Sequence, residues 1–359
     1  MSARRVAWLL VAGVLVIAFA IWLSSRRHLE RDMTAGALVL PRLEQNVNAV
    51  TIVTLRKGDG THATLKSDGG VWRVQERGWP ADVSKVRKLL LDLGALNIVE
   101  EKTRLPTNYP QLGVEDVNTP KAAGTRIDVT SPARSWAVII GKSSGGKSGY
   151  VRVANAPQTL LAAPLLSVDS DPKNWLERGL LDVPVARVRQ VEERPVQGPA
   201  YSAARDKKEQ ADFAVSPLPK GRELTNAAAA EPITTALGSL TFDDVRKRDP
   251  TNDPPAATAI YRTFDGLEVE LSGRKDGTHS LIAISARSTA KETAAEAQQL
   301  ATRLAGWEFE IPDYKYNAIF TPLEDLLKKP PQPAAKKPAG TPKKAESAAQ
   351  SAKGEVISK

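Results

Sequence analysis

The sequence contains no cysteine and only three histidines among its 359 residues. The absence of cysteine excludes disulfide bonds, thiolate metal sites and cysteine nucleophiles. The histidines His28, His62 and His279 are far apart, and they accompany no H-x-x-x-H or carboxylate spacing that would indicate a metal site. We therefore predict no metal ion and no cofactor, and we expect the histidines to lie at the surface.

The sequence also lacks a nucleophile elbow that would single out a catalytic serine. Its G-x-S-x-G match, from Gly141 to Gly145, lies in a Gly/Ser/Lys stretch that is followed by a strand-like segment and not by a helix. The adjacent acids Glu100-Glu101, Glu192-Glu193 and Asp243-Asp244 supply candidate acid–base groups. Adjacent side chains diverge on a helix or a strand, so we expect these pairs to be solvated surface groups. The sequence predicts no catalytic residue, and we expect that the protein is not an enzyme.

An excess of basic charge is missing from the central part of the chain, although the formal net charge is +9. Residues 1–32 carry five arginines against two acids, and residues 328–359 carry eight lysines against two acids. The intervening residues 33–327 hold 37 basic and 37 acidic residues. Because this body is neutral, it gives no sign of a nucleic-acid-binding face, and we predict no nucleic-acid partner.

Residues 6–23 form an uncharged apolar run of 18 residues. A helix of this length spans about 27 Å, close to the thickness of the hydrocarbon core of a bilayer. Trp8 and Trp22 lie near the ends of the run, where indole rings favour the headgroup region. Residues 1–32 are therefore predicted to be an N-terminal membrane anchor. The alternative is a cleaved signal peptide, with Ala18-Phe19-Ala20 as a small-x-small site.

Basic residues flank the predicted anchor on both sides, two before it and three after it. Counted literally, this distribution would keep the body in the cytoplasm. Long domains are translocated largely regardless of charge, and a short tail before a single anchor is compatible with an external body. We therefore predict a single-pass protein whose body lies on the extracytoplasmic side.

Two stretches of the body resemble each other. Leu93-Gly94-Ala95-Leu96 recurs as Leu237-Gly238-Ser239-Leu240, and each motif ends an apolar-periodic helical segment. Strand-like alternation precedes both segments, and a pair of alternating strands follows both. These features predict an α+β fold in which residues 43–184 and 185–327 form two tandem repeated units of antiparallel strands with one or two helices each. The alternative is that two ordinary α+β stretches share four residues by chance.

Each unit is expected to contain one helix whose start can be located. Asp82 is a candidate N-cap for a helix from Val83 to Leu96, with the apolar residues on one stripe that includes Val83. Pro232 suits the start of the second helix. The residues expected to face inward from this second helix are Ile233, Leu237 and Leu240.

Several large aromatic residues lie on or beside the expected helices and strands: Trp72, Trp136, Trp175, Phe213 and Trp307. Rings of this size bury much apolar area, so we expect them to pack in the core. Aromatic platforms for a glycan are the alternative. A cleft between the two units is the expected place for a ligand or a partner.

One motif matches the phosphate-loop pattern G-x-x-x-x-G-K-[ST], from Gly141 to Ser148. In a nucleotide site the final Ser opens a helix whose N-terminus faces the phosphates. Here the following residues Gly149-Tyr150-Val151-Arg152-Val153 alternate as a strand, so we expect a hairpin loop. Nucleotide binding by this loop is the alternative.

The C-terminal residues 328–359 consist mainly of Pro, Ala, Lys, Gly and Ser and have almost nothing to bury. We predict a disordered tail that acts as a solvated spacer. The alternative is contact between its lysines and anionic lipid or cell-wall polymer.

A series of short motifs follows the predicted anchor in a fixed order: Trp72-Arg73-Val74, Pro80-Ala81-Asp82, Tyr109-Pro110-Gln111-Leu112-Gly113-Val114, Ile139-Ile140-Gly141, Gly149-Tyr150-Val151-Arg152, Trp175-Leu176 and Tyr261-Arg262-Thr263-Phe264-Asp265-Gly266-Leu267. Over residues 43–327 this order resembles the bacterial family known as domain of unknown function 4340. The resemblance implies a single-pass envelope protein, often associated with ABC-type export systems that include gliding-motility-like auxiliary subunits. It supplies no catalytic residues, and the basic tail is outside its pattern.

The anchor, the missing catalytic motifs and the resemblance together predict a non-catalytic accessory or scaffold protein of an ABC-type transport complex. Its expected partners are the bacterial inner membrane and a protein of that complex, with the body in the periplasm. The alternative is an envelope binding module for glycan, lipid or peptidoglycan, which would use the cleft between the units and the basic tail.

Overall fold

The structure is a computed structural model, and it describes residues 35–249 and 256–329 of the chain. The predicted anchor in residues 1–32 lies outside the described residues, as does the predicted tail beyond Lys329. Within the described ranges, no helix combines the length and the apolar character needed to cross a membrane.

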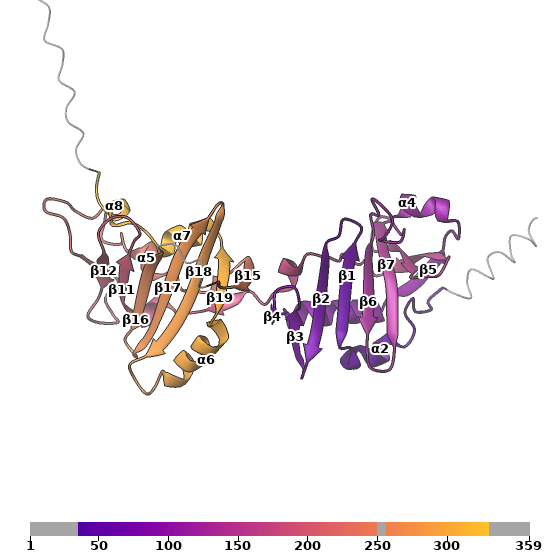
Figure 1. The fold of residues 1–359 in the computed structure, drawn as a ribbon, viewed down its shortest axis with the longest axis horizontal. Helices are drawn as coiled ribbons and strands as arrows, with labels where there is room; N and C mark the ends of the chain where they lie inside the picture. The colour runs from indigo at the N-terminus through magenta and orange to yellow at the C-terminus, as the bar shows by residue number, and fades with distance from the viewer. Residues whose placement is uncertain (1–34, 250–255, 330–359) are drawn as a thin grey trace, which may run out of the picture.

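The first unit is built on a nine-stranded antiparallel sheet with the strand order β4-β3-β2-β1-β6-β7-β8-β9-β5 (Figure 1). Its strands are β1 (Ile52–Lys57), β2 (His62–Asp68), β3 (Val71–Val74), β4 (Trp79–Pro80), β5 (Asn97–Glu101), β6 (Thr125–Thr130), β7 (Ser135–Ser143), β8 (Gly149–Val153) and β9 (Thr159–Ala163). Strand β1 pairs with both β2 and β6, so it joins the first hairpin to the later meander. Strand β5 pairs with β9 at the far edge.

The alternation of side chains along the strands decides which face of this sheet is buried. Val53 and Leu55 of β1 and Ile127 of β6 are 0% exposed and face the core. Arg56 and Asp128 lie between such positions and point to the opposite face, where Arg56 Nη2 is 2.8 Å from Asp128 Oδ2. At β1 and β6 the sheet therefore has one apolar and one polar face, whereas at β7 Ile139 is buried on the opposite face and packs with Tyr109 and Val114.

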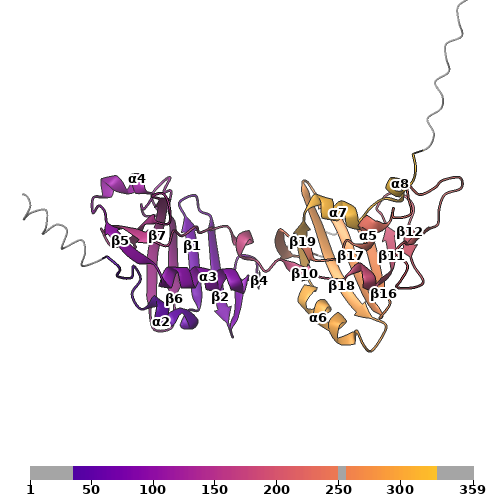
Figure 2. The same cartoon turned by 180° about the vertical axis from the view of Figure 1, so that it is seen from behind.

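Helix α3 (Val83–Gly94) covers the apolar face of the first sheet (Figure 2). The Asp82 carboxylate accepts a hydrogen bond from the Lys85 backbone N–H at 3.1 Å, so the predicted N-cap is confirmed. Its inward stripe is buried and consists of Val86, Leu89, Leu90 and Leu93. Val83 was expected on that stripe but is 45% exposed, because it begins the helix and no preceding turn lies beneath its side chain.

The remaining helices of the first unit are short. They are α2 (Leu43–Asn46), α4 (Tyr109–Leu112) and the 3-10 helices η1 (Val47–Ala49), η2 (Pro106–Asn108) and η3 (Pro172–Trp175).

The second unit holds an eight-stranded antiparallel sheet with the order β13-β12-β11-β16-β17-β18-β19-β15 (Figure 1). Its strands are β11 (Val188–Arg194), β12 (Tyr201–Ala204), β13 (Ala214–Ser216), β15 (Asp244–Lys247), β16 (Ala257–Thr263), β17 (Leu267–Asp276), β18 (His279–Ser288) and β19 (Trp307–Ile311). Strands β10 (Gly179–Leu181) and β14 (Leu240–Thr241) form a separate antiparallel pair.

Helix α6 (Ala294–Leu304) lies along β18, and Ala297 and Leu304 are its buried residues (Figure 1). The other helices of the second unit are η4 (Val185–Arg187), α5 (Glu231–Thr234), α7 (Asp313–Ile319) and α8 (Leu323–Leu326).

The helix expected from Pro232 is much shorter than the apolar spacing predicts. Helix α5 ends at Thr234, and Ser239 has a positive φ of 47°. Leu237 and Leu240 are nevertheless 0% exposed, and Leu240 lies on β14. The apolar spacing was therefore right about burial and wrong about the helix, because the chain turns here to pair with β10.

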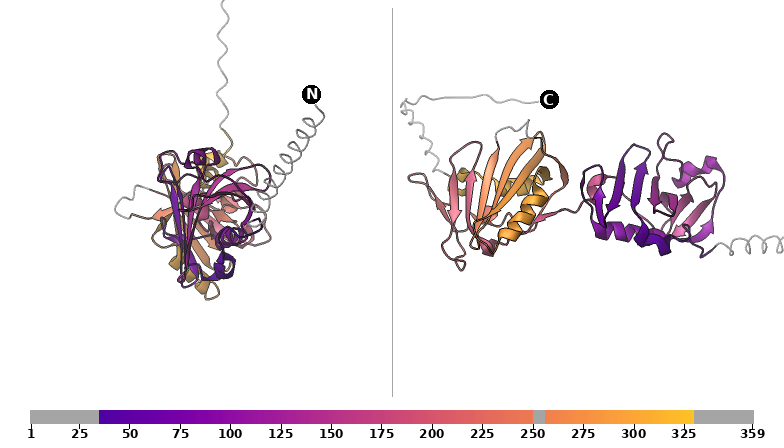
Figure 3. Two further views of the ribbon diagram at one scale, coloured as in Figure 1. Left: turned by 90° about the vertical axis from the view of Figure 1, so that its right-hand side faces the viewer. Right: turned by 60° about the horizontal axis from the view of Figure 1, so that its bottom comes forward.

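The fold is of the α+β class, with antiparallel sheets and few helices, as the sequence predicts. The two units lie end to end in an elongated body (Figures 1 and 3). The connector between them is held on both sides, since Leu176 bridges Ala81 of the first unit and β10 pairs with β14 of the second. The two ends of the described chain lie at opposite ends of this body (Figure 1).

Candidate functional site at the junction of the two units

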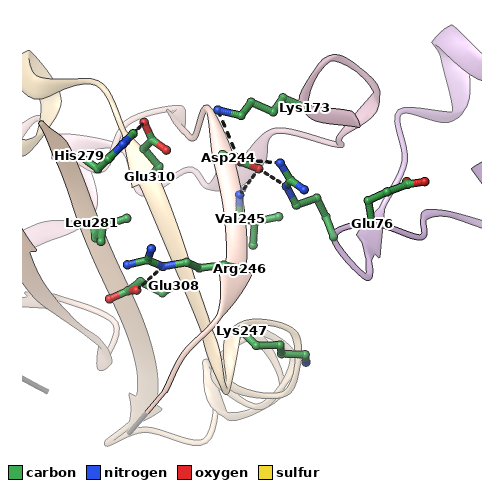
Figure 4. Close-up of a pocket in the computed structure, with 11 residues that line it drawn as sticks. Glu76, Lys173, Asp244, Val245, Arg246, Lys247, His279, Leu281, Glu308 and Glu310 are labelled. Atoms are coloured by element: carbon green, nitrogen blue, oxygen red, sulfur yellow. Dashed lines mark hydrogen bonds and ion pairs between the residues drawn. The ribbon is translucent and has the colours of Figure 1, made fainter. Parts of the chain in front are cut away.

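A hollow of about 510 Å³ lies where the two units meet. The first unit contributes Glu76 and Arg77 from the turn after β3, and Lys173 comes from η3. The second unit contributes residues of β15, β18 and β19 (Figure 4). Both units are therefore needed to form this hollow.

The turn between β3 and β4 positions the first unit's side chains. The N–H groups of Arg77 and Gly78 both donate to the Val74 carbonyl oxygen, at 3.2 and 2.8 Å. Gly78 has a positive φ of 68°, a conformation that glycine adopts readily, and an added Cβ would lie 3.3 Å from the Trp307 ring. This turn directs Arg77 toward the second unit and places Trp79 directly after it.

Arg77 forms a bidentate ion pair across the junction. Its Nε donates to Asp244 Oδ1 at 2.6 Å, and its Nη2 donates to Asp244 Oδ2 at 3.1 Å. Lys173 Nζ lies 3.4 Å from Oδ2, and the Val245 N–H donates to Oδ1 at 2.8 Å. Burial alone would raise the pKa of Asp244, but these hydrogen bonds and cations hold that pKa below its ordinary value. Asp244 therefore stays ionised and links both units.

Trp79 provides the apolar part of the junction. Its ring makes edge-on contacts with Phe242, Trp307 and Phe309, at centroid distances of 5.8, 5.3 and 5.1 Å. Its Nε1 donates to the Glu177 carbonyl oxygen at 2.9 Å, and the residue is 2% exposed. Each such ring pair contributes about 0.5–1.5 kcal/mol beyond the area it buries. The first unit thus inserts one indole ring into the core of the second.

A second group of charged residues lies on strands β15, β17, β18 and β19, on the same side of the second sheet as Asp244. Glu308 Oε1 accepts from Arg274 Nε at 2.7 Å, and Glu308 Oε2 accepts from Arg246 Nε at 2.9 Å. The Glu308 side chain is only 5% exposed. His279 Nδ1 lies 2.8 Å from Glu310 Oε1. In total, four acidic side chains and four lysines or arginines line the hollow.

This balance of charge decides what the hollow can do chemically. Asp244 and Glu308 are both paired with cations, and the lowered pKa of Asp244 makes its carboxylate a poor proton acceptor. Within the described ranges, no group of three or more His, Cys, Asp or Glu residues is placed to hold a metal ion. The arrangement is suited to joining the two units, and a ligand would need charges of both signs to replace the internal pairs.

Comparison with known protein families identifies the chain. Residues 72–259 match the family described as Domain of unknown function (DUF4340). The chain belongs to the DUF4340 family. The match includes the junction residues Arg77, Trp79 and Asp244, and it is narrower than the range 43–327 expected from the sequence motifs. No curated protein and no solved structure matches the chain.

In this DUF4340 protein the phosphate-loop pattern from Gly141 to Ser148 forms the turn of a hairpin. Strand β7 ends at Ser143 and β8 begins at Gly149, and the Ser144 N–H donates to the Ser148 carbonyl oxygen at 3.1 Å. The prediction of a hairpin loop is confirmed. A strand follows the motif, so the loop lacks the helix that a phosphate site of this type requires.

The two histidines that the structure describes are exposed, as predicted. The exposed fractions of the side chains are 56% for His62 and 54% for His279. His62 Nε2 lies 3.8 Å from Glu76, and His279 contacts Glu310, so both histidines lie beside acids of the hollow. His28 is outside the described residues.

The acidic pairs differ from the prediction at two positions. Glu192 faces outward and pairs with Arg262 at 2.9 Å, whereas Glu193 is 1% exposed. The prediction of a solvated pair was wrong for Glu193, because adjacent residues of a strand face opposite sides and one of them must face the core. The Asp244 side chain is 16% exposed, since Arg77 covers it.

The aromatic residues pack in the core as predicted, to different degrees. Trp136, Trp175 and Phe213 are buried, while Trp72 and Trp307 are partly exposed and pack against the same core.

Sequence reasoning missed the residues at the centre of the junction. Arg77 and Asp244 are 167 positions apart in the chain. Asp244 stands out in the sequence only as half of the acidic pair Asp243-Asp244, and nothing there indicates Arg77 as its partner. Trp79 follows Gly78 and precedes Pro80, which indicates a turn but not a contact with the other unit.

Proposed function

We propose that this DUF4340 protein is a membrane-anchored, extracytoplasmic accessory or scaffold protein of an ABC-type transport complex and that it acts without catalysis. The main support is the junction, where Arg77, Asp244 and Trp79 join two sheets into one elongated body. A body joined in this way holds its two ends apart in a set orientation, as a spacer or docking platform requires. The predicted anchor in residues 6–23 would tether one end to the membrane.

The polar face of the second sheet also supports a structural role. The Glu268 side chain is 7% exposed and pairs with Arg262 at 3.0 Å and with Arg287. Arg262 in turn pairs with Glu192 at 2.9 Å. In these ion pairs the charged side chains of the sheet bind one another. This arrangement favours a structural role for the polar face over a role as an acid–base site.

We further propose that the two units are repeats of one ancestral unit. In each sheet, the first strand of a hairpin (β1 or β11) lies beside the first strand of a meander (β6 or β16). The strand that follows the helix (β5 or β15) lies beyond the last meander strand (β9 or β19). In each unit, the segment that enters the unit pairs with residues at the recurring Leu-Gly-x-Leu motif. In the first unit this pairing is the Leu38–Asn97 bridge, and in the second it is the pairing of β10 with β14.

Co-purification tests the accessory role. The full chain, tagged at its C-terminus, is isolated from detergent-solubilised membranes, and the accompanying proteins are identified by mass spectrometry. We expect the permease subunit of an ABC-type complex. The control is a tagged chain that keeps residues 1–34 and lacks the body. A pull-down of the full chain that contains no permease would contradict the proposal.

Membrane topology is tested separately with paired reporters fused after Leu327, one active only outside the cytoplasm and one only inside. We expect activity of the outside reporter alone. Activity of the inside reporter would overturn the extracytoplasmic location and would support the literal count of basic residues around the anchor.

The second candidate function is an envelope binding module for glycan, lipid or peptidoglycan. It is favoured by the 510 Å³ hollow between the units and by the basic residues 328–359. Pelleting with isolated cell wall or with liposomes, with and without residues 328–359, distinguishes this function from the accessory role. Pelleting that depends on these residues, without a co-purifying permease, would favour the second candidate.

A further inference from the structure

The outer side of α3 is a surface without a partner in the described part of the chain. Val83, Arg87 and Leu91 follow one another at four-residue spacing, so they form one stripe along the helix. Val83 is 45% exposed and Leu91 is 55% exposed. A single exposed aliphatic residue is ordinary, but here an arginine, a residue type enriched in protein interfaces, lies between two of them.

Hollows lie beside this stripe. One of about 330 Å³ is lined by residues of α3 alone, including Val83, Arg87 and Leu91. Another of about 200 Å³ lies between α3 and the neighbouring strands, and its lining includes Val83, Arg87 and Trp72. Figure 2 shows α3 on the outside of the first sheet with no other helix across it. These hollows give the side chains of a docked helix places to enter.

The outer side of α3 carries more basic than acidic side chains, and one of the basic side chains has no hydrogen-bond or ion-pair partner among the described residues. Lys88 Nζ is 2.6 Å from Asp92 Oδ2, and Lys85 Nζ donates to the Asn174 carbonyl oxygen at 3.0 Å. Arg87, by contrast, has no hydrogen bond or ion pair with any residue that the structure describes. A guanidinium group presents five N–H donors in a planar fork that matches a carboxylate. The stripe is therefore complementary to an acidic side chain flanked by apolar ones.

We propose that the stripe Val83, Arg87 and Leu91, here called the α3 stripe, docks a helix of a protein partner that presents an acidic residue between two aliphatic residues. Val83 and Leu91 are two helical turns apart, about 12 Å, which is the spacing of residues i and i+8 on a partner helix. The carboxylate pairs with Arg87, and the aliphatic side chains enter the adjacent hollows. A helix without an acid would leave Arg87 desolvated and unpaired, which disfavours it.

This proposal rests on the proposed function, because it takes the partner from the transport complex. The test uses the full chain with Arg87→Glu or Leu91→Ser. Each variant should lower the yield of co-purified permease at least tenfold, since residues at the centre of an interface dominate its affinity. Matched controls in the same unit are Arg134→Glu, an exposed arginine in the β6–β7 turn, and Leu105→Ser, which replaces a leucine that is 62% exposed. The controls should retain the permease, and all four variants should keep the wild-type melting temperature.

The outcomes separate the two proposals. A wild-type chain that captures no permease contradicts the accessory role itself. A wild-type chain that captures it while Arg87→Glu and Leu91→Ser capture it equally overturns docking at the α3 stripe and leaves the accessory role intact.

A second experiment tests the α3 stripe directly in cells. A photo-reactive amino acid in place of Leu91 should cross-link to a helical segment of another protein that contains an acidic residue, and Arg87→Glu should abolish the adduct. Adducts with a second copy of this chain, with lipid, or with a segment that lacks an acidic residue would overturn the proposal. The absence of any adduct would overturn it as well.

Discussion

The carboxyl group of Glu193 is buried in the second unit, and we predict that its replacement by glutamine stabilises the fold. Glu193 is 1% exposed, and within the described ranges its Oε1 has no hydrogen-bond partner. The neighbouring Tyr201 and Tyr261 donate their hydroxyl groups to the carbonyl oxygens of Thr321 and Ile233 instead. Burial raises the pKa of Glu193 from 4.5 to about 9. The folded protein therefore holds a neutral carboxyl group at neutral pH.

The sign of the pH dependence follows from the protons bound by each state. Between pH 4.5 and about 9 the folded chain keeps a proton on Glu193 that the unfolded chain releases. This contribution to stability is fully present below pH 4.5 and falls by about 1.4 kcal/mol for each pH unit above it. At pH 7 the loss reaches roughly 3 kcal/mol. Glutamine does not titrate, so Glu193→Gln removes the slope.

Urea denaturation of the wild-type and variant chains at pH 5, 6, 7 and 8 measures this effect. The stability gained by Glu193→Gln should grow by about 1.4 kcal/mol per pH unit. Glu192→Gln is the matched control on the opposite face. Hydrogen bonds from Arg262 and Arg194 lower the pKa of Glu192, so this variant should lose stability at neutral pH, and the loss should disappear as the pH falls through that lowered pKa. A gain for Glu193→Gln that stays constant from pH 5 to pH 8, or no gain at all, would refute the reasoning.

Four further predictions concern the junction, the second sheet and the hairpin. Trp79→Ala removes the ring contacts with the second unit and should lower the free energy of unfolding by about 3–5 kcal/mol in urea denaturation, whereas a loss below about 1 kcal/mol would contradict the packing. Asp244→Asn leaves the cations Arg77 and Lys173 without their anion and should speed hydrogen–deuterium exchange in the connector between the units; unchanged exchange would show that the ion pair does not hold the units together. Gly273→Ala places a Cβ against the Phe320 ring and should destabilise the second unit by about 1–3 kcal/mol, so an unchanged melting temperature would contradict the close approach. Lys147→Ala in the exposed hairpin should change stability by less than about 0.5 kcal/mol and leave co-purification with the permease intact; loss of the permease would reopen the nucleotide alternative.

Local features of this chain are predictable because their signals lie within a few residues. Asp82 indicates the start of α3, and the structure confirms it as the N-cap. The alternation after Ser148 indicates a strand, so the hairpin could be distinguished from a phosphate loop. The spacing of Leu237 and Leu240 predicted burial correctly but not conformation, because a helix and a turn followed by a strand can both bury two residues three positions apart.

The junction could not be predicted in the same way. Asp244 gives no local sign of its partner Arg77, since the pairing depends on how two sheets meet. Trp79 was one aromatic residue among several, and its place between the units follows from β4 lying at a sheet edge. Glu193 shows the same limit within one sheet, because the pair Glu192-Glu193 does not reveal which acid faces inward until the strand register is known.

The direction of the strands has a mechanical consequence. In both units the strands run across the long axis of the body (Figure 1). A pull along this axis would separate neighbouring strands one hydrogen bond at a time, as a zipper opens, instead of shearing many bonds at once. The connector and the Arg77–Asp244 pair lie in series with both sheets along this axis, so they carry the same tension as the sheets whenever the two ends of the body are pulled apart.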